Sequence, residues 1–421
     1  MKLAFWALLI SLNALPAPPD SALQMLAKAA RLGDVKTTEM LLSAGVNPNV
    51  PNQQGLTPLS YAVLFDHRDV AALLLAHHAD PNGGVTGGTS VDETPLQTAV
   101  SMGNLRLAWT LITAGAQVDA RSKAGRTALH FAVVGSHLDM IRLLIGKGAR
   151  VGTRDTEGTS PLDDSVWRGY LEATAILLAH GASLNEPETK TGATPINEAA
   201  YRGETQIVRY LLQFSPNLKL ADKGGYTPVE NAIRKGNSEA AVLLLEAQAK
   251  DQDTPEYLGK LITEAAKKDE VAVVEALLRR GVNVSELLSS GATPLDIAAS
   301  SGALNVVRAL LDGGADPNKT ARSGSSPLED AALRGWSSIA AVLLDHGARL
   351  NEVNSDSGKT ALYAAASFGK GEVVRLLLQR GADVNLCGTG RTTPYKAALD
   401  NGFDAIAAQI SRHGGSKECK R

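Results

Sequence analysis

The eight histidines are the side chains best suited to metal binding or to acid–base chemistry near neutral pH. Four of them recur at one position, at the end of a Leu-rich segment that is predicted to be helical: His77, His180, His346 and His413. Elsewhere the same position carries other cations: Lys147, Arg280 and Arg380. The helix dipole stabilises a cation at a helix C-terminus by about 0.3–1 kcal/mol. We therefore interpret these histidines as helix-end residues and expect no metal site among them.

The cysteines and carboxylates show no spacing typical of an active site. Cys387 and Cys419 are too few for a disulfide framework or a cysteine-rich zinc site, and we expect both to be free thiols. The sequence holds no His-Glu-x-x-His, Cys-x-x-Cys, Gly-x-Ser-x-Gly or Gly-x-x-x-x-Gly-Lys motif. The acidic residues closest to a carboxylate pair are expected to be scattered surface groups: Asp163, Asp164, Glu329 and Asp330. We therefore predict no catalytic residue, no metal and no cofactor.

The elements that would position any site recur along the chain. Thr-Pro steps and their variants follow one another at intervals of 33, 34 or 37 residues, with one gap of 66. They are Thr57-Pro58, Thr94-Pro95, Thr127-Ala128, Ser160-Pro161, Thr194-Pro195, Thr227-Pro228, Thr293-Pro294, Ser326-Pro327, Thr360-Ala361 and Thr393-Pro394. A hidden unit in the long gap and another before Thr57 bring the number to twelve.

Each unit predicts two short helices. The Thr or Ser caps the first helix, and Pro suits the first helical position, where its missing N–H is not needed. A small residue, usually Ala, follows five positions later and allows helices to approach closely; a Gly nine positions after the cap suits a left-handed helix end. Helices of about ten residues are unstable alone in water, so each unit must bury its apolar face against the next. The predicted fold is an all-α solenoid.

Residues about 22–415 resemble the ankyrin-repeat family. The resemblance rests on segments such as Gly125-Arg126-Thr127-Ala128-Leu129-His130-Phe131-Ala132 and Gly313-Gly314-Ala315-Asp316-Pro317-Asn318. It implies stacked helix–turn–helix units with projecting β-hairpin loops. It also implies a concave face on which protein partners bind, a module without a catalytic site, and a role for His130 in tying loops together.

Two irregular units divide the predicted stack. Lys260-Leu261 stands where the cap of the eighth unit is expected, and Thr254-Pro255 offers a replacement six residues earlier, with a longer helix from about Pro255 to Lys268. The loop before it, Gln248–Asp253, lacks the usual Gly-Ala pattern. We predict repeats 1–7 over residues 18–250, repeats 8–12 over 251–415, a weaker junction between them, and a polar tail over 416–421.

The resemblance to the ankyrin-repeat family implies that the residues seven and eight positions after each cap face the concave surface of the stack. In units 5–8 they carry cations and aromatic rings and no acid: Trp167, Arg168, Tyr201, Arg202, Arg234, Lys235, Lys267 and Lys268. We call these eight residues the cation–aromatic surface. Such a surface suits an acidic polypeptide. The alternative is a set of solvated helix ends whose cations stabilise the helix dipole.

The N-terminal segment differs from the repeats. Lys2, the apolar run Leu3–Leu12 and small residues before Pro18 are typical of a secretory signal peptide over residues 1–17, although a buried first helix is an alternative. The run is shorter than the roughly 20 residues of a membrane span. We therefore expect an exported protein. A longer glycine-rich loop is expected over residues 82–90.

Charge and pattern together set the function classes. The 42 Lys and Arg balance 44 Asp and Glu, which excludes a polybasic nucleic-acid-binding chain. The leading hypothesis is a monomeric, non-enzymatic scaffold that binds a protein with an acidic surface. The first alternative is an inhibitor or immunity-type partner of an exported enzyme. The second is an enzyme with a site in the irregular units 7 and 8.

Overall fold

The computed structural model describes residues 19–52, 55–83, 93–387 and 392–419, and these form helices, turns and loops without a β-strand. The predicted signal peptide lies outside the described residues, as do residues 84–90 of the predicted glycine-rich loop. Contacts divide the chain into two compact parts, each of several repeats, which we call the first and the second unit from here on. The first runs to Ala199 and includes residues 214–216 and 222–224; the second holds the remainder. The predicted boundary at residue 250 lies inside the second unit and stays a prediction about stability.

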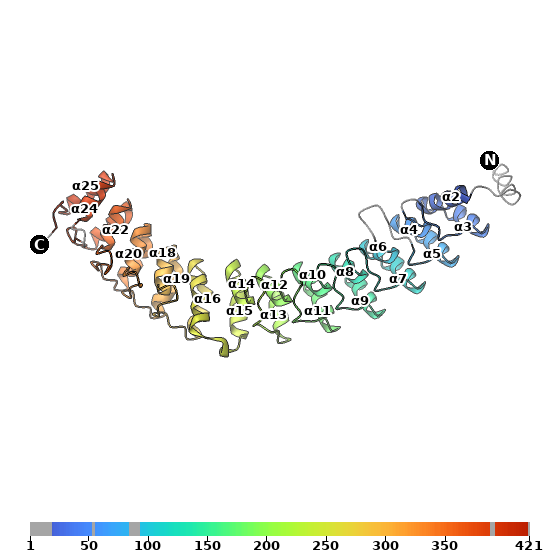
Figure 1. Ribbon diagram of the computed structural model, residues 1–421, viewed down its shortest axis with the longest axis horizontal. Coiled ribbons are helices and arrows are strands. Elements are labelled where there is room, and N and C mark those ends of the chain that lie inside the picture. The colour runs from blue at the N-terminus through green and yellow to red at the C-terminus, as the bar shows by residue number, and fades with distance from the viewer. Residues whose placement is uncertain (1–18, 53–54, 84–92, 388–391, 420–421) are drawn as a thin grey trace. The chain divides into compact units, whose positions relative to one another are not determined.

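The described helices alternate between two kinds, as Figure 1 shows along each unit. The first helices follow the Thr-Pro steps and their equivalents: α2 (Pro19–Leu32), α4 (Pro58–Leu64), α6 (Pro95–Ser101), α8 (Ala128–Val134), α10 (Pro161–Trp167), α12 (Pro195–Arg202), α14 (Pro228–Lys235), α16 (Pro255–Lys267), α18 (Pro294–Ser301), α20 (Pro327–Arg334), α22 (Ala361–Ser367) and α24 (Pro394–Asp400).

The second helices carry the Leu-rich segments, and a short 3₁₀ helix, η1 (Lys250–Gln252), precedes α16. They are α3 (Val35–Ser43), α5 (Arg68–Ala76), α7 (Leu105–Thr113), α9 (Leu138–Gly146), α11 (Leu171–Ala179), α13 (Thr205–Leu212), α15 (Ser238–Ala247), α17 (Val271–Arg279), α19 (Leu304–Asp312), α21 (Ser337–Asp345), α23 (Gly371–Gln379) and α25 (Asp404–Arg412).

Caps and small residues act as the sequence predicts. The Thr94 side chain accepts a hydrogen bond from the backbone N–H of Gln97, and the Gln97 side chain accepts one from the backbone N–H of Thr94. Both exchanges satisfy helix-terminal donors that would otherwise be unpaired. The small residue five positions after the cap is buried in each first helix from α4 to α24; Ser165 takes the place of Ala in α10. Consecutive first helices can therefore pack closely, as α20 does with both α18 and α22.

The Trp336 side chain explains why a glycine, Gly302, follows α18. Gly302 ends α18 with a φ of 83°, a left-handed conformation that disfavours side chains. A Cβ atom there would lie 2.8 Å from the Trp336 ring of the next repeat, too close for van der Waals contact. The indole also donates a hydrogen bond of 3.3 Å to the Ser300 carbonyl. The ring thus packs against the C-terminal end of α18 and connects two consecutive repeats.

The irregular region before α16 is joined by one arginine. Thr254 caps α16 by accepting a hydrogen bond from the Tyr257 N–H, so the replacement cap is confirmed and the helix ends at Lys267. The Arg280 guanidinium, just after α17, donates to both carboxylate oxygens of Asp253 and to the backbone carbonyls of Leu245 and Gln248. It thereby binds the carbonyl end of α15, which lacks the usual glycine. We predicted only a helix-dipole role for this residue, and its four hydrogen bonds go beyond that role.

The expectation of two free thiols is wrong. Cys387 and Cys419 form a disulfide across a sequence separation of 32 residues, about one repeat period. Cys387 lies in the loop before α24 and Cys419 in the tail after α25. The tail follows its second helix as the loops follow theirs, and Asn385 of the loop accepts a hydrogen bond from the Ser416 N–H. The repeat period therefore brings the two cysteines side by side.

None of the helices in the described part of the chain is long and apolar enough to cross a membrane.

Candidate partner-binding surface

All eight residues of the cation–aromatic surface are exposed, at or directly after the C-terminal ends of α10, α12, α14 and α16. The Trp167 and Tyr201 side chains are the large aromatic groups among them, 50% and 42% exposed. Trp167 and Arg168 belong to the first unit and the other six residues to the second. The structure therefore describes the surface as two groups.

Stacking on aromatic rings orders several of these cations. The Lys235 ammonium lies 4.2 Å from the centre of the Tyr201 ring, and the Arg168 guanidinium lies 5.6 Å from the Trp167 ring. Contacts of this kind contribute about 0.5–1 kcal/mol at exposed sites. Side chains held in this way lose less conformational entropy when a partner binds. The arrangement is thus suited to binding a negatively charged polypeptide.

Tyr226 extends the surface, and sequence analysis missed it. Its ring lies 3.5 Å from the Arg234 guanidinium and 5.5 Å from the Lys260 ammonium. Together with Ile233 and Leu261 these residues line a small hollow of about 170 Å³ between α14 and α16. The signal was available, because Tyr226 directly precedes the cap at Thr227, a position that holds no aromatic residue in the other repeats with a recognised cap.

The cations in this region are not equally available to a partner, because some of them form ion pairs within the chain. Lys267 pairs with Glu264 on its own helix at 2.8 Å. Lys260 pairs with the buried carboxylate of Glu230 at 2.5 Å, and this hydrogen bond raises the pKa of Lys260. The charge of Lys260 is therefore balanced within the hollow, and Arg234 and Lys235 contribute more to the positive character of α14.

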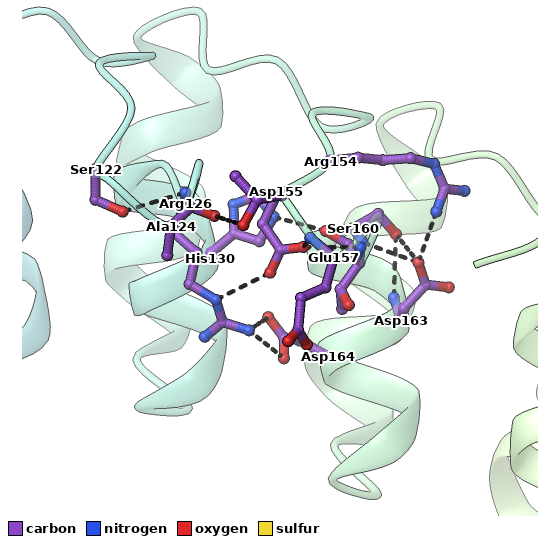
Figure 2. Close-up of polar contacts among 12 residues, drawn as sticks. Ser122, Ala124, Arg126, His130, Arg154, Asp155, Glu157, Ser160, Asp163 and Asp164 are labelled. Atoms are coloured by element: carbon purple, nitrogen blue, oxygen red, sulfur yellow. Dashed lines mark hydrogen bonds and ion pairs between the residues drawn. The ribbon is translucent and has the colours of Figure 1, made fainter. Parts of the chain in front are cut away.

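Two acidic residues that we expected to be scattered on the surface are instead held in ion pairs with arginines, so that expectation is wrong. Figure 2 shows Asp164 of α10 accepting two hydrogen bonds of 3.1 Å from Arg126, which also donates to Asp155. Asp163 accepts the Ser160 N–H and pairs with Arg154 at 3.2 Å. Both carboxylates are largely buried, and burial raises their pKa values.

His130 lies within the same network and has no catalytic geometry. Its Nδ1 accepts a hydrogen bond from the Thr127 N–H, and its Nε2 lies 3.1 Å from the Thr159 carbonyl of the next repeat. Burial lowers the pKa of His130 to about 4. The neutral ring links two loops, which is the role that the family resemblance implies.

A second carboxylate cluster lies on α18 and α20. Asp296 accepts a hydrogen bond from Thr293 N–H through one oxygen, while its other oxygen is buried without a hydrogen bond. Burial raises the pKa of Asp296 to about 6; burial and the nearby Asp296 and Glu329 charges raise the pKa of Asp330 to about 7. The expectation of scattered surface acids is therefore also wrong for Glu329 and Asp330. In the described residues no group of three His, Cys, Asp or Glu side chains could hold a metal.

Asp330→Asn is expected to change how stability depends on pH. The pKa of this carboxyl lies near 7 in the folded protein, above its value near 3.8 in the unfolded chain. The folded protein therefore loses stability as the pH rises between those two values. The variant should therefore gain about 2 kcal/mol relative to the parent between pH 5 and pH 8. Urea unfolding at both pH values measures this. Asp400→Asn, at an exposed position of α24, is the control and should show no such gain; an equal gain in both variants would contradict the assignment.

Comparison with known families decides the identity of the fold. The family described as "Ankyrin repeats (3 copies)" matches residues 26–122, 96–188, 184–256, 259–321 and 313–388. The chain belongs to the ankyrin-repeat family. The matches overlap and each covers several copies, so the number of twelve repeats stays our prediction.

The relatives that the chain matches are proteins of diverse kinds. Cyclin-dependent kinase inhibitor 2A from Homo sapiens is 38% identical over 101 residues, 24% of this chain and 62% of that protein. Potassium channel AKT2/3 from Arabidopsis thaliana is 34% identical over 114 residues, 27% of this chain and 14% of the channel. Protein phosphatase 1 regulatory subunit 12A from Mus musculus is 28% identical over 91 residues, 22% of this chain and 9% of that protein. The chain thus matches less than two thirds of each of these three ankyrin-repeat proteins.

Proposed function

We propose that this ankyrin-repeat chain is a monomeric, non-enzymatic scaffold that binds an acidic polypeptide on the concave face of its stack. The observation that carries the proposal is the cation–aromatic surface, where Lys235 is stacked on an exposed Tyr201 and Arg234 on Tyr226. Ankyrin repeats are interaction modules, and names such as kinase inhibitor and phosphatase regulatory subunit among the relatives support a binding role.

Charge reversal across the surface tests this proposal. The variant carries Glu at Arg202, Arg234, Lys235 and Lys267, and its far-ultraviolet circular dichroism should match the parent because exposed substitutions rarely change stability by more than about 0.5 kcal/mol. Capture of partners from the native compartment should weaken, and the salt dependence of binding should flatten.

A matched control keeps the same change in net charge. It carries Glu at four exposed cations of second helices in the same unit: Arg209, Arg279, Arg308 and Arg375. This control should bind the partner as the parent does. Equal loss of binding in both variants would mean that overall charge, and not the cation–aromatic surface, governs binding.

A second candidate function is inhibition of an exported enzyme. Two observations favour it. The relatives include proteins named as inhibitors of cyclin-dependent kinases. The disulfide between Cys387 and Cys419 is of a kind that persists mainly in oxidising compartments.

Export through a signal peptide over residues 1–17 is part of the proposal. The mature protein should begin between about Leu15 and Ser21, where small residues follow the apolar run. Sequencing of the N-terminus of protein recovered from its native source measures this. Recovery of chains that keep Met1 in the cytosol would overturn export and leave the binding proposal intact.

A further inference from the structure

A second cavity of the second unit adjoins the hollow beside Tyr226, with which it shares Glu230, Lys260 and Glu264. It measures about 750 Å³ and is bounded by the N-terminal half of α16 and the loop of residues 281–290. This volume is within the range of about 300–1,000 Å³ that is usual for ligand-binding clefts. We call it the α16 cleft.

The cleft exists because α16 begins six residues earlier than the repeat period would place it. Its first turns, Pro255–Lys260, therefore form a wall that the shorter first helices lack. Gly259 of that wall faces the loop, since a Cβ atom there would lie 2.9 Å from Leu288 Cδ2. Because Gly259 has no side chain, Leu288 of the loop can approach α16. The early cap at Thr254 thus produces the cavity.

The loop contributes two leucines at positions where several other loops carry polar or charged residues. Leu287 and Leu288 precede Gly291 at the positions that hold Arg121-Ser122 and Arg154-Asp155 in earlier loops. Leu287 is 36% exposed and lines the cleft together with Pro255 and Val282. An apolar side chain can therefore be buried there, which a loop with only a structural role does not require.

The charge of the cleft is negative. Its carboxylates are Glu230, Asp253, Glu256, Glu264 and Glu286, and Lys260 is its only cationic side chain. Three of these carboxylates are balanced by Lys260, Arg280 and Lys267. Glu256, in the first turn of α16, and Glu286, in the loop, form no side-chain hydrogen bond or ion pair with a described residue. Two unbalanced acids thus line one cleft that also has apolar walls.

We propose that the α16 cleft binds an extended basic segment of a partner protein, with an Arg or Lys side chain between Glu256 and Glu286 and an adjacent apolar side chain against Leu287. Long cationic side chains are suited to this because their methylene groups pack on apolar surface while the charged end reaches the carboxylates. The site adjoins the cation–aromatic surface and has the opposite charge, so a partner with both acidic and basic segments engages the two in one orientation.

A labelled peptide tests the cleft without knowledge of the partner. The probe is fluorescein-Gly-Ser-Leu-Arg-Leu-Arg-Leu-Ser-Gly, and the full chain is titrated against it in fluorescence anisotropy at low salt. The double variant Glu256→Gln, Glu286→Gln should weaken binding about tenfold or more, because two charge-assisted contacts are lost. Leu287→Ser should weaken binding separately, through the apolar contact.

Controls separate the cleft from general acidity and from the proposed function. Glu246→Gln with Glu275→Gln removes two exposed acids from second helices of the same unit and should leave the peptide affinity unchanged. A probe with Glu in place of both Arg residues should not bind the cleft. The charge-reversed cation–aromatic variant should bind the Arg probe at least as well as the parent.

Three results would overturn the proposal: no binding of the Arg probe to the parent, equal binding to the Glu256→Gln, Glu286→Gln variant, or self-association of the chain that this variant abolishes. The last result, seen by sedimentation velocity without probe, would assign the cleft to a second copy of the chain.

Discussion

Replacement of Arg280 by methionine is expected to lower the free energy of unfolding of the second unit by about 3 kcal/mol. The Arg280 and Asp253 side chains are only 9% and 11% exposed, and two of their atoms lie 2.5 Å apart. Methionine keeps much of the apolar volume but leaves the Asp253 carboxylate without its cation. It also removes the donor to the Leu245 and Gln248 carbonyls at the end of α15.

Chemical unfolding followed by circular dichroism measures the loss. Arg279→Met is the control, because the neighbouring arginine is 60% exposed and reaches Glu246 only at 3.8 Å. That variant should change stability by about 0.5 kcal/mol or less. Asp253→Asn combined with Arg280→Met should be less harmful than the sum of the single changes, since the buried charge is then removed together with its partner.

Hydrogen exchange locates the effect along the chain. We expect amides across Ala247–Lys260 to exchange faster than those across Thr293–Leu311 already in the parent, because α15 lacks its terminal glycine and the loop before α16 is irregular. Arg280→Met should widen that difference. Uniform protection along the described helices of the second unit in both proteins would show that the junction is as stable as its neighbours and would contradict the predicted weak point.

Local features of this fold could be predicted from the sequence, and contacts between repeats could not be predicted as well. The Thr94 cap, the buried Ala99 and the replacement cap at Thr254 depend on residues a few positions apart, so their effect is visible in one unit. The exposure of Trp167 followed for the same reason, because its position within its helix fixes the direction of its side chain.

Most of the errors concern pairs of residues separated by about one repeat. Arg126 and Asp164 are 38 residues apart, Arg280 and Asp253 are 27 apart, and the two cysteines are 32 apart. Each partner alone resembles a surface residue or a free thiol. In a solenoid, residues one period apart become neighbours, so complementary pairs at that spacing are the signal that would have identified these contacts.

The α16 cleft shows a limit of a different kind. The early cap at Thr254 could be read from the sequence, and so could Leu287 and Leu288 in the following loop. Their meeting across a cavity depends on the path of the loop after α17, which no local pattern specifies. The volume enclosed by these elements is a property of the packed structure.

Loss of the disulfide between Cys387 and Cys419 is expected to destabilise the last helix pair by about 4 kcal/mol, the value that chain-entropy arguments give for a loop of this size. The loop closed by the bond contains α24 and α25. This pair is the last that the structure describes, so the tail on its outer side takes the place of a following repeat. Cys387→Ser with Cys419→Ser should therefore raise the exchange rates of α24 and α25 amides and leave α18 and α19 unchanged.

The tail also forms hydrogen bonds to the loop before α24. Asn385 donates to the Gly414 carbonyl and accepts from the Ser416 N–H, each at 2.9 Å. Neutral hydrogen bonds of this kind contribute about 1 kcal/mol each. Asn385→Ala is thus expected to have a smaller effect than loss of the disulfide, and the two changes together should release the tail.

Chemical reduction of the disulfide separates the effect of losing the bond from the effect of substituting the two cysteines. Dithiothreitol should increase α24 and α25 exchange in the parent to the level of the double serine variant, and should have no effect on that variant. A parent that keeps full protection after complete reduction, verified by mass after thiol alkylation, would show that packing alone holds the last pair. Since the bond persists only where thiols are oxidised, protein made in a reducing cytosol should resemble the serine variant, and exported protein should not.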